Sequence, residues 1–378
     1  MAENPGQDIK CKVIRQLGID ARISMKTLMS SVGGARSSAY GLFNSVTSEY
    51  GLKFVPEINI SNLWKWEFIK RARMQTKRGI IAEATMEELP VAGFGEYMVL
   101  VKFAGKPPGD EIIRAALSAF DAPQFAARLD GDYDLIIYAV ARSYEEALEF
   151  TDGFSKKLDK QNMTTYTNRV WGIFGFFPVN AKLIGKFDIF DSYKNLLLGL
   201  NESGRKTFSD IGRKANQGPA QMLYAYDRLV RTGILRRITY YETKPKSTIN
   251  VLFKIKATNA KSFDGAKDAW FMRLIKEYEK MENECVFMCD IPSPKGMLVI
   301  GSFEKADRLK NFVGMMKSSL DGIEITQTKI TSVLQGSLGI RDFDMRYTQQ
   351  YASLARRRMV PRLNEKPVEA ISDNPDAL

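Results

Sequence analysis

The stretch Gly204–Arg237, GRKTFSDIGRKANQGPAQMLYAYDRLVRTGILRR, predicts how the surrounding chain folds. Thr207 is a good N-cap residue, and Asp210, three positions later, makes a variant of the capping box that opens a helix. Residues 216–218 form a turn signal, and Pro219 suits the first turn of the next helix. We therefore expect two short helices that are joined by a turn and followed by a basic strand.

The neighbouring residues complete a winged helix-turn-helix. A further helix is predicted over 192–201, before the stretch, and a strand over 234–242 at its end. A weaker copy of this pattern lies near the N-terminus at a constant offset, which aligns Arg22 with Arg205 and Ser24 with Thr207. In that copy we expect helices over 11–18, 24–32 and 35–50 and a strand over 52–58.

Each copy is followed by the order βαββαβ, which is the ferredoxin-like plan. The predicted fold is therefore α+β, with two tandem units that each contain a winged helix-turn-helix followed by a ferredoxin-like domain. The first sheet domain is expected to have strands over 97–103, 124–130, 134–141 and 163–171 and helices over 110–120 and 144–160. The second is expected to have strands over 249–255, 285–290, 297–303 and 323–334 and helices over 263–279 and 305–320.

The domain boundaries follow from these elements. The predicted ranges are 1–60 (first winged helix-turn-helix), 61–95 (basic helical insert or linker), 96–180 (first ferredoxin-like domain), 181–246 (second winged helix-turn-helix), 247–335 (second ferredoxin-like domain) and 336–378 (C-terminal helix and disordered tail). In the insert, Ser61 is a suitable N-cap, and we expect Trp64 and Trp66 to pack rather than to stack on bases. Its segment 70–78, KRARMQTKR, suits either a grip on a nucleic-acid backbone or a solvated helix.

The charge of the chain is segregated along its length. Lysine and arginine total 55 against 44 aspartate and glutamate, a formal net charge of +11. The basic excess lies mainly in 1–80 and 181–246, whereas acidic residues predominate in 81–180. Local positive potential attracts phosphate backbones or anionic lipid heads.

The chain contains no histidine and three cysteines. The absence of histidine excludes Ser-His-Asp and Cys-His catalysis and every His-ligated metal site, so we expect no enzyme activity, no metal and no cofactor. The few cysteines are typical of a reducing cytoplasm. The N-terminus has no apolar signal core, and no apolar run is long enough to span a membrane.

Two segments resemble a known family. Leu196–Tyr241 is similar to the DNA-binding domain of the Lrp/AsnC (feast/famine) transcriptional regulators, and Ala127–Val140, ARLDGDYDLIIYAV, is similar to their strand-turn-strand. Ordinary members of the family have one unit per chain, so the tandem arrangement departs from the family pattern and is closest to archaeal members of this group. The resemblance implies a sequence-specific regulator that binds double-stranded DNA, with sheet domains paired face to face and a small effector, often an amino acid, between them. It also implies a homo-oligomer (dimer) or an intrachain pseudo-dimer.

The DNA-contacting residues are expected mainly in the second copy. Gln and Tyr side chains of the recognition helix suit base edges, and flanking Lys and Arg suit phosphates, although a solvated helical face is the alternative. In the first copy, base reading and a structural or partner-binding role remain equally open. The residues are Arg205, Lys206, Arg213, Lys214, Gln217, Gln221, Tyr224, Arg228, Arg231, Arg236 and Arg237, with Arg22, Arg36, Ser37, Ser38 and Tyr40 in the first copy.

The expected effector site is the turn Gly131, Asp132, Tyr133 and Asp134. The resemblance places it near the effector pocket, although the residue types favour a tight turn over a ligand site. Two other functions remain open. A related group, the siroheme decarboxylases, uses the same two-domain unit, but that resemblance implies catalytic histidines. A protein-interaction adaptor that has lost DNA binding is the other alternative.

Overall fold

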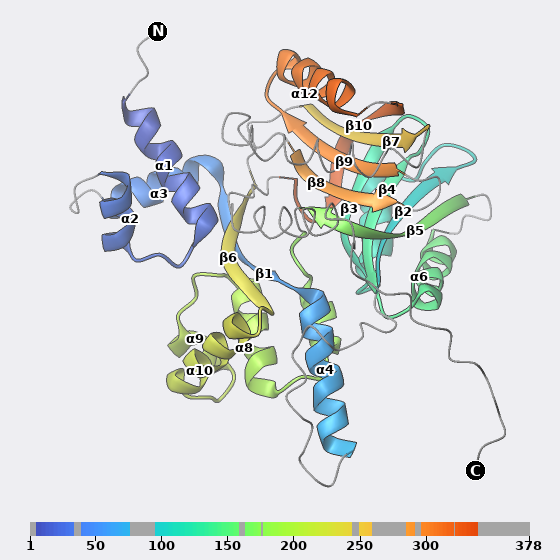
Figure 1. Ribbon diagram of the computed structural model, residues 1–378. Helices are drawn as coiled ribbons and strands as arrows, with labels where there is room; N and C mark the ends of the chain where they lie inside the picture. Colours follow the sequence, from blue (N-terminus) through green and yellow to red (C-terminus); the bar gives the residue numbers. More distant parts are fainter. Residues whose placement is uncertain are drawn as a thin grey trace, which may run out of the picture.

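The computed structural model describes residues 5–33, 39–75, 95–158, 163–174, 177–243, 249–258, 285–291, 296–320 and 322–338. Within these ranges the chain forms two helical lobes, a two-stranded ribbon between them and a closed antiparallel sheet (Figure 1). The expected α+β fold class, with a winged helix-turn-helix and a ferredoxin-like domain in each of two units, is confirmed. The domain boundaries themselves stay predictions.

The first helix-turn-helix forms the N-terminal lobe. Its second helix begins as predicted, because Ser24 Oγ accepts a hydrogen bond from Thr27 N at 3.1 Å. Gly33 ends that helix with a left-handed φ of 75°. The elements are α1 (Pro5–Ile19), α2 (Met25–Val32), α3 (Ala39–Tyr50) and β1 (Leu52–Ile58).

The second helix-turn-helix forms the other lobe with the same local chemistry. Thr207 Oγ1 accepts from Asp210 N at 3.1 Å, and its hydroxyl donates to Asp210 Oδ2 at 2.6 Å, which confirms the predicted cap. A Cβ at Gly212 would collide with the carbonyl oxygen of Gln217, so the turn needs glycine there. The elements are α7 (Ala181–Lys186), α8 (Asp191–Glu202), α9 (Phe208–Lys214), α10 (Pro219–Arg231) and β6 (Leu235–Glu242).

The two wing strands pair with each other. β1 and β6 form an antiparallel ribbon, with Leu52 opposite Glu242 and Pro56 opposite Ile238, which lies between the two lobes (Figure 1). Gly204 donates its N–H to Phe54 O at 2.8 Å, and a Cβ on Gly204 would collide with the side chain of Ile238. The ribbon therefore joins the lobes into one unit.

The two sheet domains together form a closed antiparallel sheet with the strand order β10-β3-β4-β2-β5-β8-β9-β7. Each half keeps the ferredoxin-like order, and the halves join where β10 pairs with β3 and β5 pairs with β8. The strands are β2 (Gly95–Phe103), β3 (Pro123–Asp130), β4 (Leu135–Ala141), β5 (Met163–Phe174), β7 (Ile249–Ala257), β8 (Cys285–Ile291), β9 (Gly296–Phe303) and β10 (Ile323–Gln335). The described helices of these halves are α5 (Asp110–Ser118), α6 (Tyr144–Lys157) and α12 (Ala306–Ser319).

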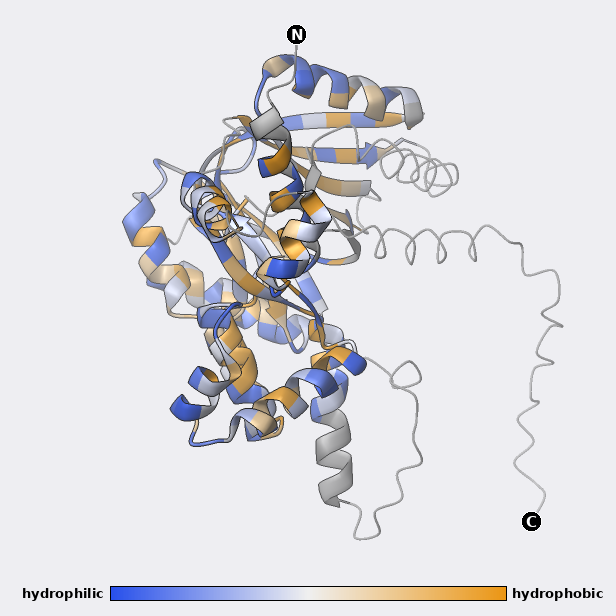
Figure 2. Cartoon of the chain, turned by 90° about the vertical axis from the view of Figure 1, so that its left-hand side faces the viewer, coloured by the Kyte–Doolittle hydropathy of each residue, from blue (hydrophilic) through white to orange (hydrophobic). Residues whose placement is uncertain are grey.

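Strand alternation separates an inner from an outer face. Hydrophobic and hydrophilic residues alternate along the strands (Figure 2). On β2, Met98 and Leu100 join the inner cluster, which also includes Leu235 of the ribbon, whereas Val99 and Val101 pack outward with α5 and α6. The ribbon thus contributes to the core inside the closed sheet. In the described part of the chain, no helix has the length and apolar character needed to cross a membrane.

The insert packs against the segment 177–193, the linker that joins the first sheet half to the second helical lobe. α4 (Ile60–Gln75) begins where Asn59 Oδ1 accepts from Asn62 N at 3.1 Å, so Asn59 rather than the expected Ser61 acts as the cap. Trp64 packs edge-on against Phe187, with ring centroids 5.4 Å apart. Trp66 packs edge-on against Tyr193 of α8, with ring centroids 5.6 Å apart. Both contacts confirm the expected packing role of the two tryptophans. The basic segment 70–78, the expected helix over 263–279 and everything after Leu338 lie outside the residues or side chains that are described.

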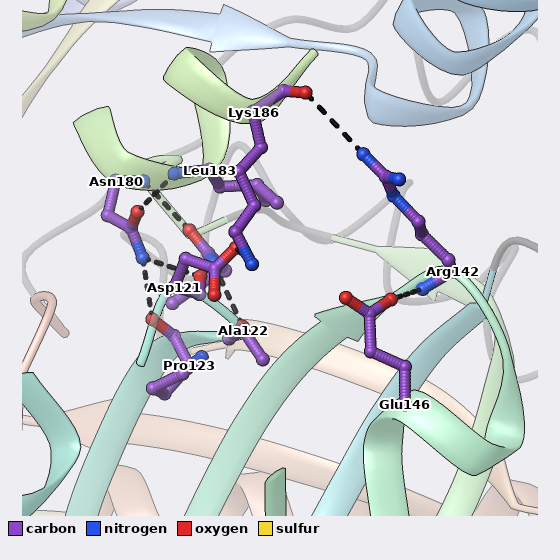
Figure 3. Close-up of polar contacts among 9 residues, drawn as sticks. Asp121, Ala122, Pro123, Arg142, Glu146, Asn180, Leu183 and Lys186 are labelled. Carbon is purple, nitrogen blue, oxygen red and sulfur yellow. Dashed lines mark hydrogen bonds and ion pairs between the residues drawn. The ribbon is translucent and has the colours of Figure 1, made fainter. Parts of the chain in front are cut away.

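A polar junction fixes the linker to the first sheet half (Figure 3). Asn180 Nδ2 donates to the carbonyl oxygens of Asp121 and Pro123, both at 2.9 Å, while Asn180 Oδ1 caps α7 through Leu183 N at 2.8 Å. Lys186 pairs with Asp121 at 2.6 Å. The second helical lobe is therefore positioned by specific contacts with the first sheet half.

Candidate functional site

The inner face of the closed sheet contains a cavity of about 360 Å³. Both halves contribute, through β2, β5 and the turn before β4 on one side and through β7, β8 and β9 on the other. The volume lies within the range of small-molecule sites, and most of the wall is apolar or aromatic, as in such sites. The lining residues are Leu100, Tyr133, Tyr166, Thr167, Asn168, Lys254, Ile291 and Leu298.

One corner of this cavity combines a cation with two tyrosines. Lys254 Nζ donates to Tyr133 Oη at 3.3 Å and lies 5.3 Å from the centroid of the same ring. Tyr133 packs edge-on against Tyr166, with centroids 5.5 Å apart, and Tyr166 is 50% exposed at the mouth. No carboxylate of the described chain pairs with Lys254, so its ammonium group is available to an anionic ligand.

In the predicted effector turn, Asp134 has a structural role and Tyr133 lines the cavity. Asp134 Oδ2 accepts from Phe103 N at 2.8 Å and Oδ1 lies 3.4 Å from Lys102 Nζ, so Asp134 ties the turn to β2. Gly131 and Asp132 are exposed, and neither they nor Asp134 line the cavity. Of the four predicted residues, Tyr133 alone faces it. Ligand binding here stays a prediction.

Sequence reasoning missed Lys254, Tyr166 and Asn168. The signal for Lys254 was present in the strand pattern of INVLFKIKA, because Leu252 and Lys254 share one face and Leu252 belongs to the inner core. A lysine at a core-facing strand position is unusual unless it has a partner or a ligand. Tyr166 and Asn168 carried no comparable signal in the sequence.

A second polar group lies on the inner face near the ribbon. Burial raises the pKa of the Glu96 carboxyl group, while a hydrogen bond with Tyr138 and the charge of Arg236 act in the opposite direction. Burial and the neighbouring Glu96 also raise the pKa of Tyr138 well above its ordinary value. The closed sheet therefore contains a carboxyl group whose pKa is raised by burial.

Two arginines predicted to contact phosphate instead link the helical lobes. The guanidinium of Arg22 donates to the carbonyl oxygens of Gly204 and Lys206, at 2.9 and 3.0 Å, and lies over the ring of Phe208. At the equivalent position, Arg205 donates to Ala21 O and lies over Phe43. Burial lowers the pKa of both groups. These reciprocal contacts link the two lobes and engage both arginines within the protein.

The two arginines of the second wing are also engaged within the protein. Arg237 Nε lies 2.6 Å from Glu57 Oε2 and a second nitrogen donates to Gly18 O at 3.0 Å, in a pair whose side chains are almost fully buried. Arg236 lies 3.2 Å from the other oxygen of Glu57. The expected wing contact with DNA is therefore replaced by an ion-pair network across the β1–β6 ribbon.

Part of the remaining predicted surface on the second lobe is exposed. Arg213 is 78% exposed beside Asp210, while Lys206 and Lys214 share Glu202. Tyr224 is 61% exposed on α10 and Gln221 is exposed too, whereas Gln217 accepts from Asn195 at 3.5 Å. The guanidinium groups of Arg228 and Arg231 make no ion pair within the described residues.

The corresponding surface of the first lobe is only partly described. Arg36, Ser37 and Ser38 lie outside the described residues, and Tyr40 is exposed at the start of α3. No group of three or more Cys, Asp or Glu side chains suited to a metal occurs among the described residues. A small cavity beside Arg142 and Lys186 has about 10 Å³, which is room for one water molecule.

Comparison with known proteins shows the fold. The chain resembles the crystal structure of siroheme decarboxylase NirDL, with a TM-score of 0.54 over 93% of this chain and 100% of that one, at 10% sequence identity. The same enzyme in complex with an iron-uroporphyrin III analogue gives a TM-score of 0.52 over 92% and 99% of the two chains, at 9% identity. The likeness covers nearly the whole of both chains.

Regulators match only part of the chain. An AsnC family transcriptional regulator from Agrobacterium tumefaciens covers 44% of this chain and 89% of its own, with 12% identity and a TM-score of 0.28. A regulator from Neisseria meningitidis in complex with L-Met covers 38% and 90%, with 16% identity and a TM-score of 0.31. At these scores they support no argument about this chain. No family model and no curated protein sequence matches.

These findings correct one expectation. The absence of histidine led us to expect no enzyme activity, but the full-length structural likeness is to an enzyme and includes a complex with its tetrapyrrole analogue. Lacking histidine removes one set of catalytic groups and leaves tyrosine, lysine and carboxylates. The absence of histidine therefore does not by itself exclude an enzyme.

Proposed function

We propose that this protein binds a carboxylate-bearing tetrapyrrole in the cavity of the closed sheet and removes carboxylate from it as CO₂. The observation that carries the proposal is the position of Lys254, an ammonium group without a carboxylate partner in the described chain, beside Tyr133 and Tyr166 in a cavity whose wall is mostly apolar or aromatic. The full-length likeness to siroheme decarboxylase supports the ligand class. A ring larger than the cavity would extend past Tyr166 at its mouth.

The chemistry needs only a bound carboxylate and a proton donor. Loss of CO₂ breaks the bond between the carboxyl carbon and the side-chain carbon, and the electron pair left on that carbon takes up one proton. No oxidant or reductant is consumed. The Lys254 ammonium would hold the carboxylate, and the Tyr133 hydroxyl, 3.3 Å from Lys254 Nζ, would supply the proton.

The test is a visible-absorption titration with iron-uroporphyrin III, followed by chromatography of the ring after incubation. Wild-type protein should shift the absorption band and yield a product that has lost carboxylate. Tyr133→Phe should retain most of the binding and lose most of the product. Lys310→Met, which removes an exposed lysine of α12 on the outer side, is the matched control and should behave as wild type.

Melting temperatures measured with a panel of amino acids distinguish the decarboxylase proposal from a cavity that binds an amino-acid effector. If a panel of amino acids raises the melting temperature and no tetrapyrrole binds, the cavity is an effector site and the decarboxylase proposal is wrong. A ring that binds equally well to protein unfolded in urea would also contradict it, since that binding would not require the closed sheet.

A second candidate is sequence-specific binding to double-stranded DNA by the second lobe, as part of a transcriptional regulator. It is favoured by Arg228 and Arg231, whose guanidinium groups have no ion-pair partner in the described structure, and by the exposed Tyr224 on the same helix. The β1–β6 ribbon and the closed sheet support an intrachain pseudo-dimer rather than a dimer of chains. A cytoplasmic location stays a prediction.

DNA binding has its own test. If it occurs, Arg231→Ala should weaken binding to all sequences and reduce the salt slope, near 0.9 log unit per log salt for each phosphate contacted, by about one contact. Gln221→Ala should cost about 1–3 kcal/mol mainly at a preferred site. Absence of duplex binding at low salt would exclude this candidate and leave the tetrapyrrole proposal unaffected.

A further inference from the structure

Asn168 faces the cavity from β5, beyond Tyr166. In the pairing of β5 with β2, Tyr166 lies opposite Leu100 and Asn168 lies opposite Met98. Leu100 and Met98 belong to the inner cluster, so Tyr166 and Asn168 share the inner face, about 7 Å apart along the strand. Tyr166 is 50% exposed, Asn168 is half-buried and Val170, the next inner residue, is buried. Asn168 therefore lines the cavity deeper than the tyrosine at its mouth.

The side-chain amide of Asn168 makes no hydrogen bond within the described residues. An asparagine side chain carries two N–H donors and one carbonyl acceptor. Partial burial of such a group without a hydrogen-bonding partner costs free energy, and a ligand that supplies the partner recovers that cost. Because Asn168 lines a cavity of about 360 Å³, its amide group is available to a polar group of a ligand.

The equivalent residue of the second half is covered. Thr328 of β10 lies opposite Leu252, the fourth residue of β7, just as Asn168 lies opposite Met98, the fourth residue of β2. Thr328 is 6% exposed, and a Cβ on Gly131 would lie 3.0 Å from its Cγ2 atom. The turn of the first half therefore packs over Thr328. Of these two equivalent positions, Asn168 is the one that a ligand can reach.

A ring that carries several similar carboxylates needs two points of attachment to bind in one orientation. A single cation can hold any one of those carboxylates, so the ring could turn and present each of them in the same place. A second hydrogen-bonding group at a fixed position removes that freedom. Asn168 reaches the cavity from β5 of the first half and Lys254 from β7 of the second, so the two groups can hold different parts of one ring.

We propose that Asn168 donates a hydrogen bond to a second carboxylate of the tetrapyrrole and thereby determines which carboxylate lies at Tyr133 and is lost as CO₂. Carboxylates are the strongest hydrogen-bond acceptors of such a ligand, and they suit the N–H groups of an amide. The carboxylate at Asn168 is retained in the product. The inference rests on the proposed function for the identity of the ligand and of the reaction.

The experiment incubates iron-uroporphyrin III with wild type, Asn168→Leu and Asn168→Asp and separates the first products by chromatography that resolves positional isomers. Wild type should yield one predominant isomer. Asn168→Leu keeps the size of the side chain and cannot donate, so binding followed by visible absorption should weaken roughly three- to tenfold and several isomers should appear. Asn168→Asp sets a carboxylate against that of the ligand and should weaken binding further.

Asn311→Leu, at an exposed asparagine of α12 on the outer side, is the matched control and should leave both binding and the product isomer unchanged. Melting temperatures show which variants fold, and Asn168→Asp, which matches the wild-type side chain in size, serves as the test if Asn168→Leu does not fold.

The outcomes separate the inference from the proposed function. The wild-type isomer alone from the Asn168 variants, or a mixture of isomers from wild type, would overturn the inference and leave the proposed function standing. Binding by Asn168→Asp as tight as that of wild type would overturn it too, because Asn168 would then accept a hydrogen bond from the ring. If wild type fails to bind the ring or to release CO₂, the proposed function fails and the inference with it.

Discussion

Glu96 lies on the inner face of the closed sheet among groups from three other strands. Tyr138 of β4 shares a hydrogen bond with its carboxyl group, Arg236 of β6 contributes a positive charge, and Cys289 of β8 is the neighbouring thiol. Burial is the largest influence and raises the pKa of the Glu96 carboxyl group above the ordinary value of 4.5. The folded protein therefore holds this proton more tightly than the unfolded chain does.

The raised pKa of Glu96 predicts a pH dependence of stability. Its stabilising contribution is fully present below the unfolded pKa, near 4.5, and is lost as pH rises through the higher folded pKa. Glu96→Gln keeps the neutral form, so we expect it to be more stable than wild type above the folded pKa and to approach wild type at low pH. Urea unfolding midpoints across pH would measure this. A difference in unfolding midpoint between Glu96→Gln and wild type that stays constant with pH would contradict this prediction.

At the residue scale, the sequence was informative where signals are local. The caps at Ser24 and Thr207 follow from their own neighbours in the chain and are confirmed. From the sequence, Arg22, Arg231 and Arg237 were predicted alike to contact DNA. In the structure, Arg22 and Arg237 have partners within the protein, on segments far away in the sequence. Which arginines remain free depends on tertiary contacts that no local pattern encodes.

At the scale of elements, the β1–β6 ribbon depends on a buried ion pair. Glu57 and Arg237 are 2% and 5% exposed, and their side chains meet at 2.6 Å. Removing one partner of a buried pair leaves the other charge without compensation and typically costs about 3–5 kcal/mol. Each wing was predicted correctly as a strand, but the pairing of β1 with β6 was not predicted. Alternation of apolar and polar residues defines the two faces of a strand and does not identify the strand that pairs with it.

This pair predicts a contrast between two arginine substitutions. Arg237→Ala should lower the free energy of unfolding by about 3–5 kcal/mol, because Glu57 stays buried. Arg213→Ala removes an exposed arginine that pairs with Asp210, so its cost should be within about 1 kcal/mol. Chemical denaturation of both variants measures the two values. Similar costs would show that Arg237 is not part of a buried pair, and a DNA-binding defect without lost stability would restore its predicted role at the wing.

At the scale of the whole molecule, neither half can complete its own structure. β1 belongs to the first half and pairs with β6 of the second, while the closed sheet needs both the β10–β3 and the β5–β8 pairings. The order of elements in each half was predictable from periodicity and caps. Closure of the sheet was not, because it joins strands whose positions in the sequence are far apart.

This arrangement predicts how the chain behaves when it is divided between residues 180 and 181. The half 1–180 on its own exposes the edges of β1, β3 and β5, and unpaired edges promote association, so it should self-associate or aggregate. Co-expressed 1–180 and 181–378 should copurify as a complex of one copy each, with a mass by light scattering equal to that of the intact chain and a similar circular dichroism spectrum. Either half purified as a stable, folded monomer would show that the ribbon and the closed sheet are dispensable, and with them the cavity that both halves build.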